Sequence, residues 1–186
     1  MAVDVKQDAE VIDRVRRGDR ATCEELVREN YAAVYRFLLN LTGDTEMAAD
    51  CTQDAFRIAW QKLADFGGRA SISSWLHRIA YNRFIDVYRK NRREHRLHES
   101  FQAEQPGEIG QVSPCATSLR DASQYLAEAV KQLPDEQRAI VALHYFEGLS
   151  ITDTSAVVGE PVGTVKWRLS TALKRLRSIV DAEAVQ

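Results

Sequence analysis

The sequence predicts an all-helical protein made of two small domains joined by a flexible linker. Apolar residues recur through most of the chain at the spacing of a buried helix face. No segment combines β-branched residues, period-two alternation and hairpin turn residues, as a strand would. Between residues 97 and 119 the periodicity stops, Pro and Gly appear and polar residues dominate, which is typical of a linker.

The N-terminal domain, residues 1–96, is expected to contain four helices. Glycine and short polar residues separate them in the stretches LTGD and FGGRAS. The expected helices span residues 8–17, 21–42, 45–64 and 73–93. On the last of them, the expected core stripe consists of Leu76, Ala80, Phe84 and Val87.

The C-terminal domain, residues 120–186, ends in a helix-turn-helix pattern. Ser150 followed by Asp153 is the reciprocal capping pattern of a helix start. Gly159 can end that helix in the left-handed conformation, and Pro161 suits the first position of the next helix. A short helix, a tight turn and a longer basic helix form the motif. The expected helices of this domain span residues 121–132, 134–146, 150–158 and 161–180.

Composition narrows the possible function classes. A hydrophobic fraction of 45% and a charged fraction of 28% are those of an ordinary soluble protein, and the net charge of −2 gives no reason to expect a nucleic acid. The charges are unevenly distributed, however, because residues 161–180 contain no acid and RFIDVYRKNRREHR forms a second basic run. No apolar run approaches the length of a membrane span and the N-terminus is not a signal peptide, so we expect a cytoplasmic protein without membrane insertion.

Nothing in the sequence predicts an enzyme. The phosphate-binding loop, the dinucleotide fingerprint and the zinc-protease motif are all missing, so no catalytic residue, metal or cofactor is expected. Cys23, Cys51 and Cys115 are odd in number and far apart, which indicates neither a disulfide framework nor a cysteine zinc site. Cys23 and Cys51 fit small buried residues of helices. A metal site on His95, His98 and Cys115 is the remaining alternative.

The helix over residues 161–180 has a basic outer face. Its buried stripe is expected to consist of Val162, Val165, Leu169, Leu173 and Leu176. The opposite face carries Thr164, Trp167, Arg168, Ser170, Thr171, Lys174 and Arg175. Such a helix fits the major groove of DNA, where Trp167 could pack on a thymine methyl or a sugar. The alternative is a solvated basic face, with Trp167 covered by the linker or by a partner helix.

The helix over residues 73–93 carries a second polar sector, which consists of Trp75, Arg78, Asn82, Asp86, Arg89 and Arg93. An aromatic ring beside Arg and Asn can stack on an unpaired base and hydrogen-bond its edge. The loop before it, residues 66–72, supplies Gly, Arg and Ser, which suit close backbone approach to a flipped nucleotide. A solvated amphipathic helix with Trp75 in the core is the alternative.

A third candidate surface lies in MAADCTQDAFRIAW. One helix edge carries Asp50, Gln53, Asp54 and Arg57, flanked by Phe56 and Trp60. Taken alone, this edge is either an exposed polar face or a binding site for a protein partner.

Together these segments resemble the extracytoplasmic-function group of bacterial sigma factors, the two-domain specificity subunits of RNA polymerase. LTGDTEMAADCTQDAFRIAWQKL is similar to the family's segment that binds core polymerase. FGGRASISSWLHRIAYNRFID is similar to the promoter-melting loop and the helix that reads the −10 element. LPDEQRAIVALHYFEGLSITDTSAVVGEPVGTVKWRLSTALKRL is similar to the −35-reading domain, so the resemblance covers residues 11–176.

The resemblance implies a subunit that binds core polymerase, directs promoter-specific initiation and is controlled by an anti-sigma factor. Docking on a coiled coil of the largest polymerase subunits would involve Asp50, Gln53, Asp54, Arg57 and Trp60. Capture of a −10 base on the non-template strand would involve Phe66, Gly67, Gly68, Arg69, Ser71, Trp75, Arg78, Asn82, Arg83, Asp86 and Arg89. The −35 duplex would meet Thr164, Lys166, Trp167, Arg168, Ser170, Thr171, Lys174 and Arg175.

The sequence departs from the family pattern in the helix-turn-helix. Asp153, Thr154 and Ser155 stand where Glu-Ile-Ala is usual. Trp167 replaces a small residue, often Ser, and Thr171 stands where Arg is frequent. The −35 sequence therefore need not match that of better-known relatives. Two other functions stay open from the residues alone: a stand-alone helix-turn-helix regulator that binds duplex DNA as a symmetric dimer, and a helical adaptor or metal sensor.

Overall fold

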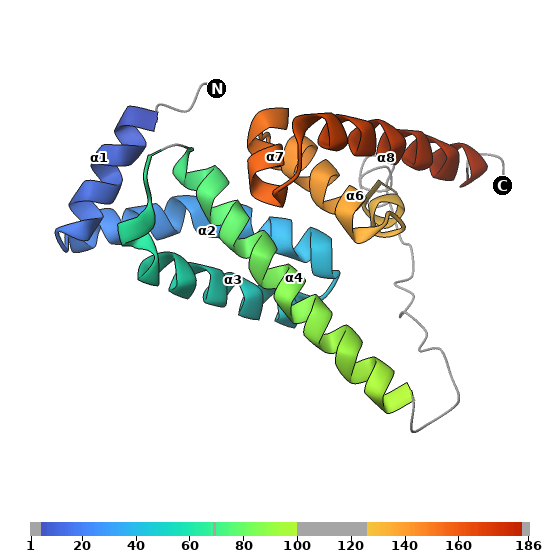
Figure 1. Ribbon diagram of the computed structural model, residues 1–186, viewed down its shortest axis with the longest axis horizontal. Coiled ribbons are helices and arrows are strands. Elements are labelled where there is room, and N and C mark those ends of the chain that lie inside the picture. Colours follow the sequence, from blue (N-terminus) through green and yellow to red (C-terminus); the bar gives the residue numbers. More distant parts are fainter. Residues whose placement is uncertain (1–4, 69, 100–125, 184–186) are drawn as a thin grey trace, which may run out of the picture.

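The computed structural model describes residues 5–68, 70–99 and 126–183, with side chains described for residues 8–68, 70–90 and 126–181. Within these ranges every regular element is a helix and none is a strand (Figure 1). The all-helical prediction is confirmed. The N-terminal helices form one group and the C-terminal helices form a second group that packs against it (Figure 1).

The N-terminal group follows the predicted order. It consists of α1 (Val5–Arg16), α2 (Arg20–Thr42), α3 (Thr45–Gln61), the 3₁₀ turn η1 (Leu63–Asp65) and α4 (Ile72–Glu99). Asp19 and Asp44 begin α2 and α3, because each side chain accepts a hydrogen bond from a backbone N–H of the first helical turn. Helix α4 continues past its expected end at residue 93. Residues 100–119 of the expected linker lie outside the described residues.

The C-terminal group begins with a helical segment at residues 126–131. It continues with α6 (Asp135–Val141), which widens into the π-helical turn η2 (Ala142–Phe146), and then α7 (Ile151–Val158) and α8 (Val162–Glu183). Residues 121–125 of the expected first helix lie outside the described residues.

The capping predicted at the two ends of α7 is confirmed. The Ser150 hydroxyl accepts a hydrogen bond from the Asp153 backbone N–H at 3.0 Å, and it donates one to the Asp153 carboxylate at 2.6 Å. Gly159 adopts a left-handed φ of 76° at the end of α7. Helix α8 begins at Val162, so Pro161 precedes the first helical position instead of occupying it.

The buried face of α8 differs in part from its prediction. Val165, Leu169 and Leu176 are buried as expected. Val162 and Leu173 were expected in the same stripe, but they are 37% and 40% exposed, respectively. The fully buried Ala172 takes the central place, because a small side chain lets α8 pack closely at that turn. The buried face is therefore rotated toward Ala172 and away from Leu173.

The two groups of helices share a hydrophobic core. Buried apolar residues of α2, α3 and α4 form one cluster with residues of the C-terminal group, namely Ala139, Ala142, Leu143, Leu149 and Val157. A second cluster lies between α6 and α8 and includes Val165 and Ala172. Helix α6 and turn η2 therefore lie between the N-terminal helices and α8.

Charged groups join the same two groups of helices. The guanidinium of Arg36 on α2 donates to both carboxylate oxygens of Glu147, at 2.7 and 3.0 Å, and the Glu147 side chain is only 2% exposed. Arg138 on α6 donates to the carbonyl oxygen of Leu41 near the end of α2, at 2.7 Å. Direct pairing of this kind satisfies the buried carboxylate and one of the last carbonyls of α2.

Candidate nucleic-acid interface

The edge of α3 presents most of its predicted residues to solvent. Asp50, Gln53 and Arg57 are exposed, and the Trp60 ring is 45% exposed. They lie at intervals of three or four residues, so they share one face of the helix. Buried Ala48, Cys51, Ala55 and Ala59 fix the opposite face in the core, and the burial of Cys51 agrees with its prediction.

Asp54 is an exception among the α3 residues because it is already paired. Its carboxylate accepts hydrogen bonds from Arg83 on α4, at 2.6 and 2.8 Å, and from Arg57 at 3.0 Å. The hydrogen bond from Arg57 and that from Arg83 lower the pKa of the carboxyl. Asp54 therefore joins α3 to α4, and Arg83, predicted at the −10 surface, is its partner.

An apolar groove lies next to the α3 edge. It has a volume of about 800 Å³, and its lining from α2 and α3 includes Cys23, Val27, Tyr31, Phe56 and Trp60. The rings of Tyr31 and Phe56 stack with centroids 5.8 Å apart. The predicted partner edge therefore continues into an aromatic surface that sequence reasoning assigned only at Trp60 and Phe56, and Cys23 is partly exposed there.

The loop between η1 and α4, residues 66–71, contains both buried and exposed residues. Phe66 is 6% exposed and packs edge-on against Trp75, with ring centroids 5.2 Å apart. Gly67 is exposed, and Gly68 adopts a left-handed φ of 65°. Ser71 is buried, and its hydroxyl accepts a hydrogen bond from the Ser74 N–H at 3.0 Å, which caps α4. Arg69 lies outside the described residues.

Phe66 and Ser71, both predicted to contact the −10 element, are buried and support the loop. One face of α4, in contrast, is exposed to solvent. Arg78, Asn82, Asp86 and Arg89 are exposed at three- and four-residue intervals along this face, and Trp75 lies partly exposed at its start. This is the polar sector predicted from the sequence. Arg93, the last member of that sector, has no described side chain.

A cavity of about 370 Å³ lies between the loop and α4. The loop contributes Phe66, Gly67 and Gly68, and α4 contributes Trp75 and Arg78. Ala156 and Val157 of α7 also line this cavity. The C-terminal group therefore covers one side of the surface predicted to take a −10 base.

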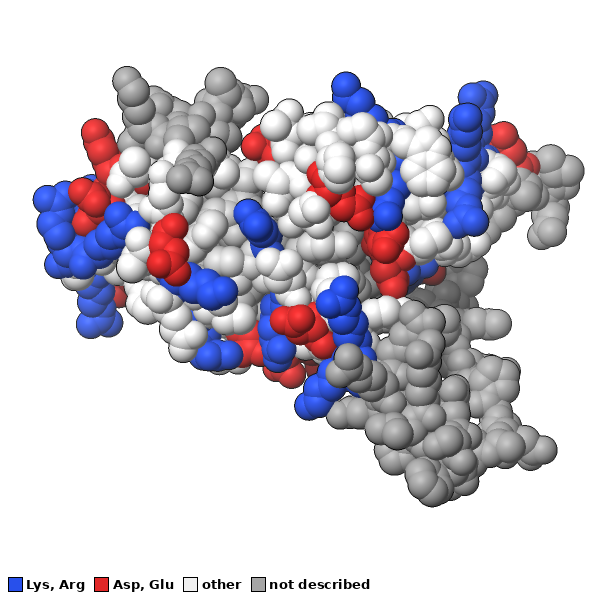
Figure 2. Space-filling model, in the orientation of Figure 1, with Lys and Arg blue, Asp and Glu red and all other residues white. Residues whose placement is uncertain are grey.

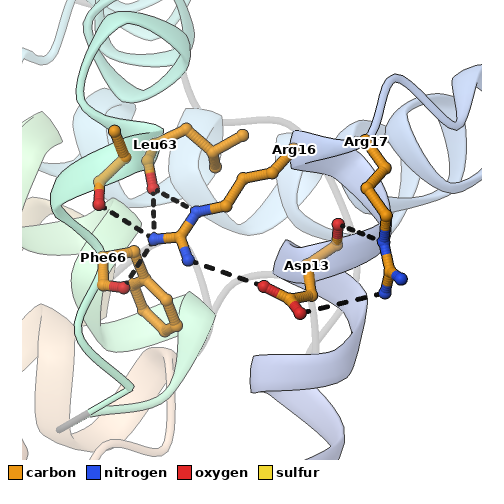
Figure 3. Close-up of polar contacts among 6 residues, drawn as sticks. Asp13, Arg16, Arg17, Leu63 and Phe66 are labelled. Atoms are coloured by element: carbon orange, nitrogen blue, oxygen red, sulfur yellow. Dashed lines mark hydrogen bonds and ion pairs between the residues drawn. The ribbon is translucent and has the colours of Figure 1, made fainter.

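Helix α1 contacts both ends of the loop, which sequence reasoning missed. The Arg16 guanidinium donates to the carbonyl oxygens of Leu63 at 2.9 Å, Ala64 at 3.0 Å and Phe66 at 2.9 Å (Figure 3). The Asp8 carboxylate accepts a hydrogen bond from the Ile72 N–H, at the start of α4, at 2.9 Å. No sequence motif indicates these bonds, because the partners of both side chains are backbone atoms about fifty or more residues away.

The outer face of α8 carries Trp167, whose side chain is the most exposed of the large hydrophobic residues within the described part of the chain, at 65%. Lys166, Ser170, Lys174 and Arg175 are exposed around it, while Thr164 and Thr171 are partly exposed. Figure 2 shows basic side chains projecting where α8 lies in Figure 1. Leu173 and Arg177 line a shallow hollow of about 390 Å³ beside Lys166 and Lys174, and neither was predicted at this surface.

Arg168 lies toward the protein and not on the outer face of α8. Its guanidinium pairs with Glu136 of α6 at 2.6 Å and with Glu160 of the preceding turn at 2.9 Å, and its side chain is 21% exposed. Thr171 donates its hydroxyl hydrogen bond to the Trp167 carbonyl at 3.0 Å. The two ion pairs of Arg168 orient α8 on α6 and the turn. The exposed residues Lys166, Trp167, Ser170, Lys174 and Arg175 remain as outward groups of α8.

Two further expectations concern metals and membranes. Among the described residues, no group of three or more His, Cys, Asp or Glu is arranged to bind a metal ion. The His95 and His98 side chains and Cys115 lie outside what is described, so the alternative based on them has no structural test. No described helix is both long enough and apolar enough to span a bilayer.

Similarity to known proteins identifies the family. The model of Sigma-70 region 2 matches residues 26–94, and that of Sigma-70, region 4 matches residues 123–176. The ECF RNA polymerase sigma factor SigM of Mycobacterium tuberculosis is 31% identical over 94% of this chain and 85% of its own length. The chain belongs to the extracytoplasmic-function (ECF) sigma factors. The resemblance seen in the sequence is therefore confirmed.

Other relatives of this ECF sigma factor agree. The RNA polymerase sigma-H factor of Pseudomonas aeruginosa is 31% identical, with 90% of each chain covered. Sigma factor RpoE of Bartonella quintana, solved with the anti-sigma factor NepR, has 26% identity and a TM-score of 0.68 over 85% of this chain and 96% of its own. CnrH, solved with the cytosolic domain of CnrY, supports the fold at 22% identity and a TM-score of 0.70, with 96% and 99% coverage.

Proposed function

We propose that this ECF sigma factor divides promoter recognition among three surfaces. The exposed edge of α3 docks on a coiled coil of core polymerase, the loop at residues 66–71 with the exposed face of α4 captures a −10 base, and the outer face of α8 reads the −35 duplex. The observation that carries the proposal is the exposure of all three predicted faces on one chain.

The physical demands on the two DNA surfaces differ. Holding an unstacked base requires a pocket with a stacking ring and polar groups, and the cavity beside Trp75 and Arg78 offers both. Reading a closed duplex requires only a helix that fits the major groove, as α8 does with Trp167 outward. The domains proposed for these tasks are residues 1–96 and 120–186, with residues 97–119 as the linker, the first three of which continue α4.

Sigma factors are initiation factors and not enzymes, so we assign no catalytic residue or cofactor to this chain. The polymerase supplies the chemistry. Because its proposed partners are core polymerase and promoter DNA, we place the protein in the cytoplasm. Control by an anti-sigma factor is part of the proposal, supported by the complex of the related RpoE with NepR.

Run-off transcription tests the proposal as a whole. Core polymerase would transcribe sheared DNA from the source organism with and without this protein, and the transcript starts would be sequenced. We expect discrete starts that depend on the protein and share two spaced upstream motifs. Duplex binding without polymerase and without new starts would instead favour a stand-alone regulator.

The docking surface has its own test. Asp50→Arg reverses an exposed charge on the α3 edge and is expected to abolish co-purification with core polymerase. Asp54 is unsuitable for this purpose because its replacement also breaks the bonds to Arg83. Glu29→Arg is the matched control, since Glu29 is exposed on α2 and is not part of the groove lining. Wild-type polymerase binding by Asp50→Arg would contradict the assignment.

A further inference from the structure

Arg16 on α1 lies where the proposed −10 loop begins. The last carbonyls of a helix lack partners within the helix and carry partial negative charge. The carbonyls of Leu63 and Ala64 in η1 and of Phe66 at its end all accept from one guanidinium (Figure 3), and within the backbone Leu63 also accepts the Phe66 N–H at 3.3 Å. A planar guanidinium has five donors in a fixed fork, so a single Arg can satisfy all three acceptors at once.

Asp8, on the same helix, lies where the loop ends. The first N–H groups of a helix also lack partners and favour a negative charge. The Asp8 carboxylate accepts the N–H of Ile72, the first residue of α4. One helix therefore bonds to the backbone at both ends of the loop, with a cation at the C-terminal end of η1 and an anion at the N-terminal end of α4.

Helix α1 also lies along the back of the loop. A side-chain carbon added at Gly68 would lie 4.0 Å from the Ala9 side chain, and α1 and the loop together line a hollow of about 470 Å³. Helix α1 is itself fixed in the core by Ile12 and Val15, which are 1% and 5% exposed. Helix α1 is therefore anchored in the core beside the loop.

We propose that Arg16 is a positioning residue for promoter opening. With Asp8, it fixes the backbone at the two ends of the loop, so that the cavity beside Trp75 and Arg78 exists before a base enters it. Preorganised groups avoid the cost of ordering when the ligand binds. This inference rests on the proposed assignment of the loop to the −10 element, and it adds a helix that precedes the region 2 match at residues 26–94.

The test compares two neighbouring arginines of α1. Arg17 is 75% exposed and pairs with Asp13 of its own helix, whereas Arg16, which also pairs with Asp13, reaches the loop (Figure 3). Full-length Arg16→Met, Arg16→Lys and Arg17→Met would each be combined with core polymerase on a promoter mapped by run-off transcription. The rate of opening would be followed with 2-aminopurine in the −10 element, and affinity for core polymerase would be measured separately.

We expect Arg16→Met to slow opening on the order of tenfold, with affinity for core polymerase unchanged. Arg16→Lys retains a donor, so its rate of opening should lie between those of Arg16→Met and the wild type. Arg17→Met should open the promoter at the wild-type rate. Opening at the wild-type rate in Arg16→Met would overturn the proposal. Loss of core affinity and opening in equal proportion would also overturn it, because that pattern indicates general damage to the domain.

Two further variants separate the possible failures. Asp8→Ala removes the acceptor and should slow opening, whereas Asp8→Asn keeps an acceptor oxygen without the charge and should slow it less. This pair decides the question if Arg16→Met folds poorly. Asn82→Ala removes an exposed group of the proposed −10 face of α4. If Asn82→Ala slows opening and the α1 variants do not, only the positioning role is wrong. If none of them does, the −10 assignment itself is wrong.

Discussion

Trp167 and Arg168 are adjacent in sequence but have opposite surroundings. Trp167 is 65% exposed, so its ring contributes little to the fold. We predict that Trp167→Ala weakens holoenzyme binding to the −35 duplex by about 1–3 kcal/mol, the scale of one good base contact, and leaves the melting temperature unchanged. Binding to promoter fragments and thermal melting would check this. Unaltered binding with a lowered melting temperature would show that the ring packs internally.

Replacing Arg168 should lower stability and leave DNA recognition unchanged, the opposite of what we expect for Trp167. Its two carboxylate partners, Glu136 and Glu160, hold α8 against α6 and the turn. Arg168→Met is expected to lower the free energy of unfolding by roughly 1–3 kcal/mol, the range for hydrogen bonds to charged groups, while the preferred −35 sequence stays the same. Chemical denaturation and selection of −35 sequences from a random pool would test both parts. A changed preference would place Arg168 at the DNA.

Asp19 gives a prediction for low pH. Hydrogen bonds from Arg14 and from Thr22 lower its pKa to about 2 from the usual 3.8. Because the folded-state pKa is the lower one, the stabilisation is complete above about pH 3.8 and is lost as the pH falls through about 2. Carboxyl NMR titration should give a midpoint near 2, and Arg14→Met should move it toward 3.8. An unchanged midpoint in the variant would exclude Arg14 as the main cause.

At the scale of single elements, local signals predicted the two ends of α7 well. Capping residues and a left-handed glycine act on the backbone within a few residues, so the boundaries at Ser150 and Gly159 can be read from the sequence. The buried face of α8 was less predictable. Ala172 and Leu173 are both apolar, so the sequence does not show which of them is buried; Ala172 packs in the cluster between α6 and α8, and Leu173 is exposed.

Contacts of side chains with partners far away in the sequence were not predictable at all. A helical wheel identifies which residues of α4 share a face, and it did so for Arg78, Asn82 and Asp86. It cannot show that Asp54 pairs with Arg83 or that Arg16 bonds to Leu63, since these partners are 29 and 47 residues apart. The candidate faces could therefore be predicted, but the residues that hold them in place could not.

Helix α7 contains a buried polar side chain, Thr154, whose hydroxyl is unsatisfied among the described residues. Thr154 stands where the family usually has an apolar residue; it is completely buried, and its hydroxyl has no hydrogen-bond partner within the described part of the chain. Thr154→Val keeps the shape and removes the unsatisfied group, so we predict a gain of about 1 kcal/mol in the free energy of unfolding. Urea denaturation would measure it. A loss of stability would mean that the hydroxyl is hydrogen-bonded.

At the scale of the whole molecule, Arg36 and Glu147 fix how the two groups of helices meet. Arg36→Glu would place two carboxylates together at an almost fully buried site, and we predict a loss of roughly 2–3 kcal/mol with a larger radius of gyration by X-ray scattering. Arg20→Glu, at the 90% exposed start of α2, is the matched control. Combining Arg36→Glu with Glu147→Arg should restore the contact. Unchanged scattering in Arg36→Glu would show that other contacts suffice.

The core shared by both groups of helices has a consequence for synthesis on the ribosome. Helices α2, α3 and α4 are complete once residue 99 has left the exit tunnel, but Leu143 and Val157, which cover their apolar surface, are translated later. At usual elongation rates this delay lasts several seconds. During that interval the nascent N-terminal half exposes the apolar surface that Leu143 and Val157 later cover.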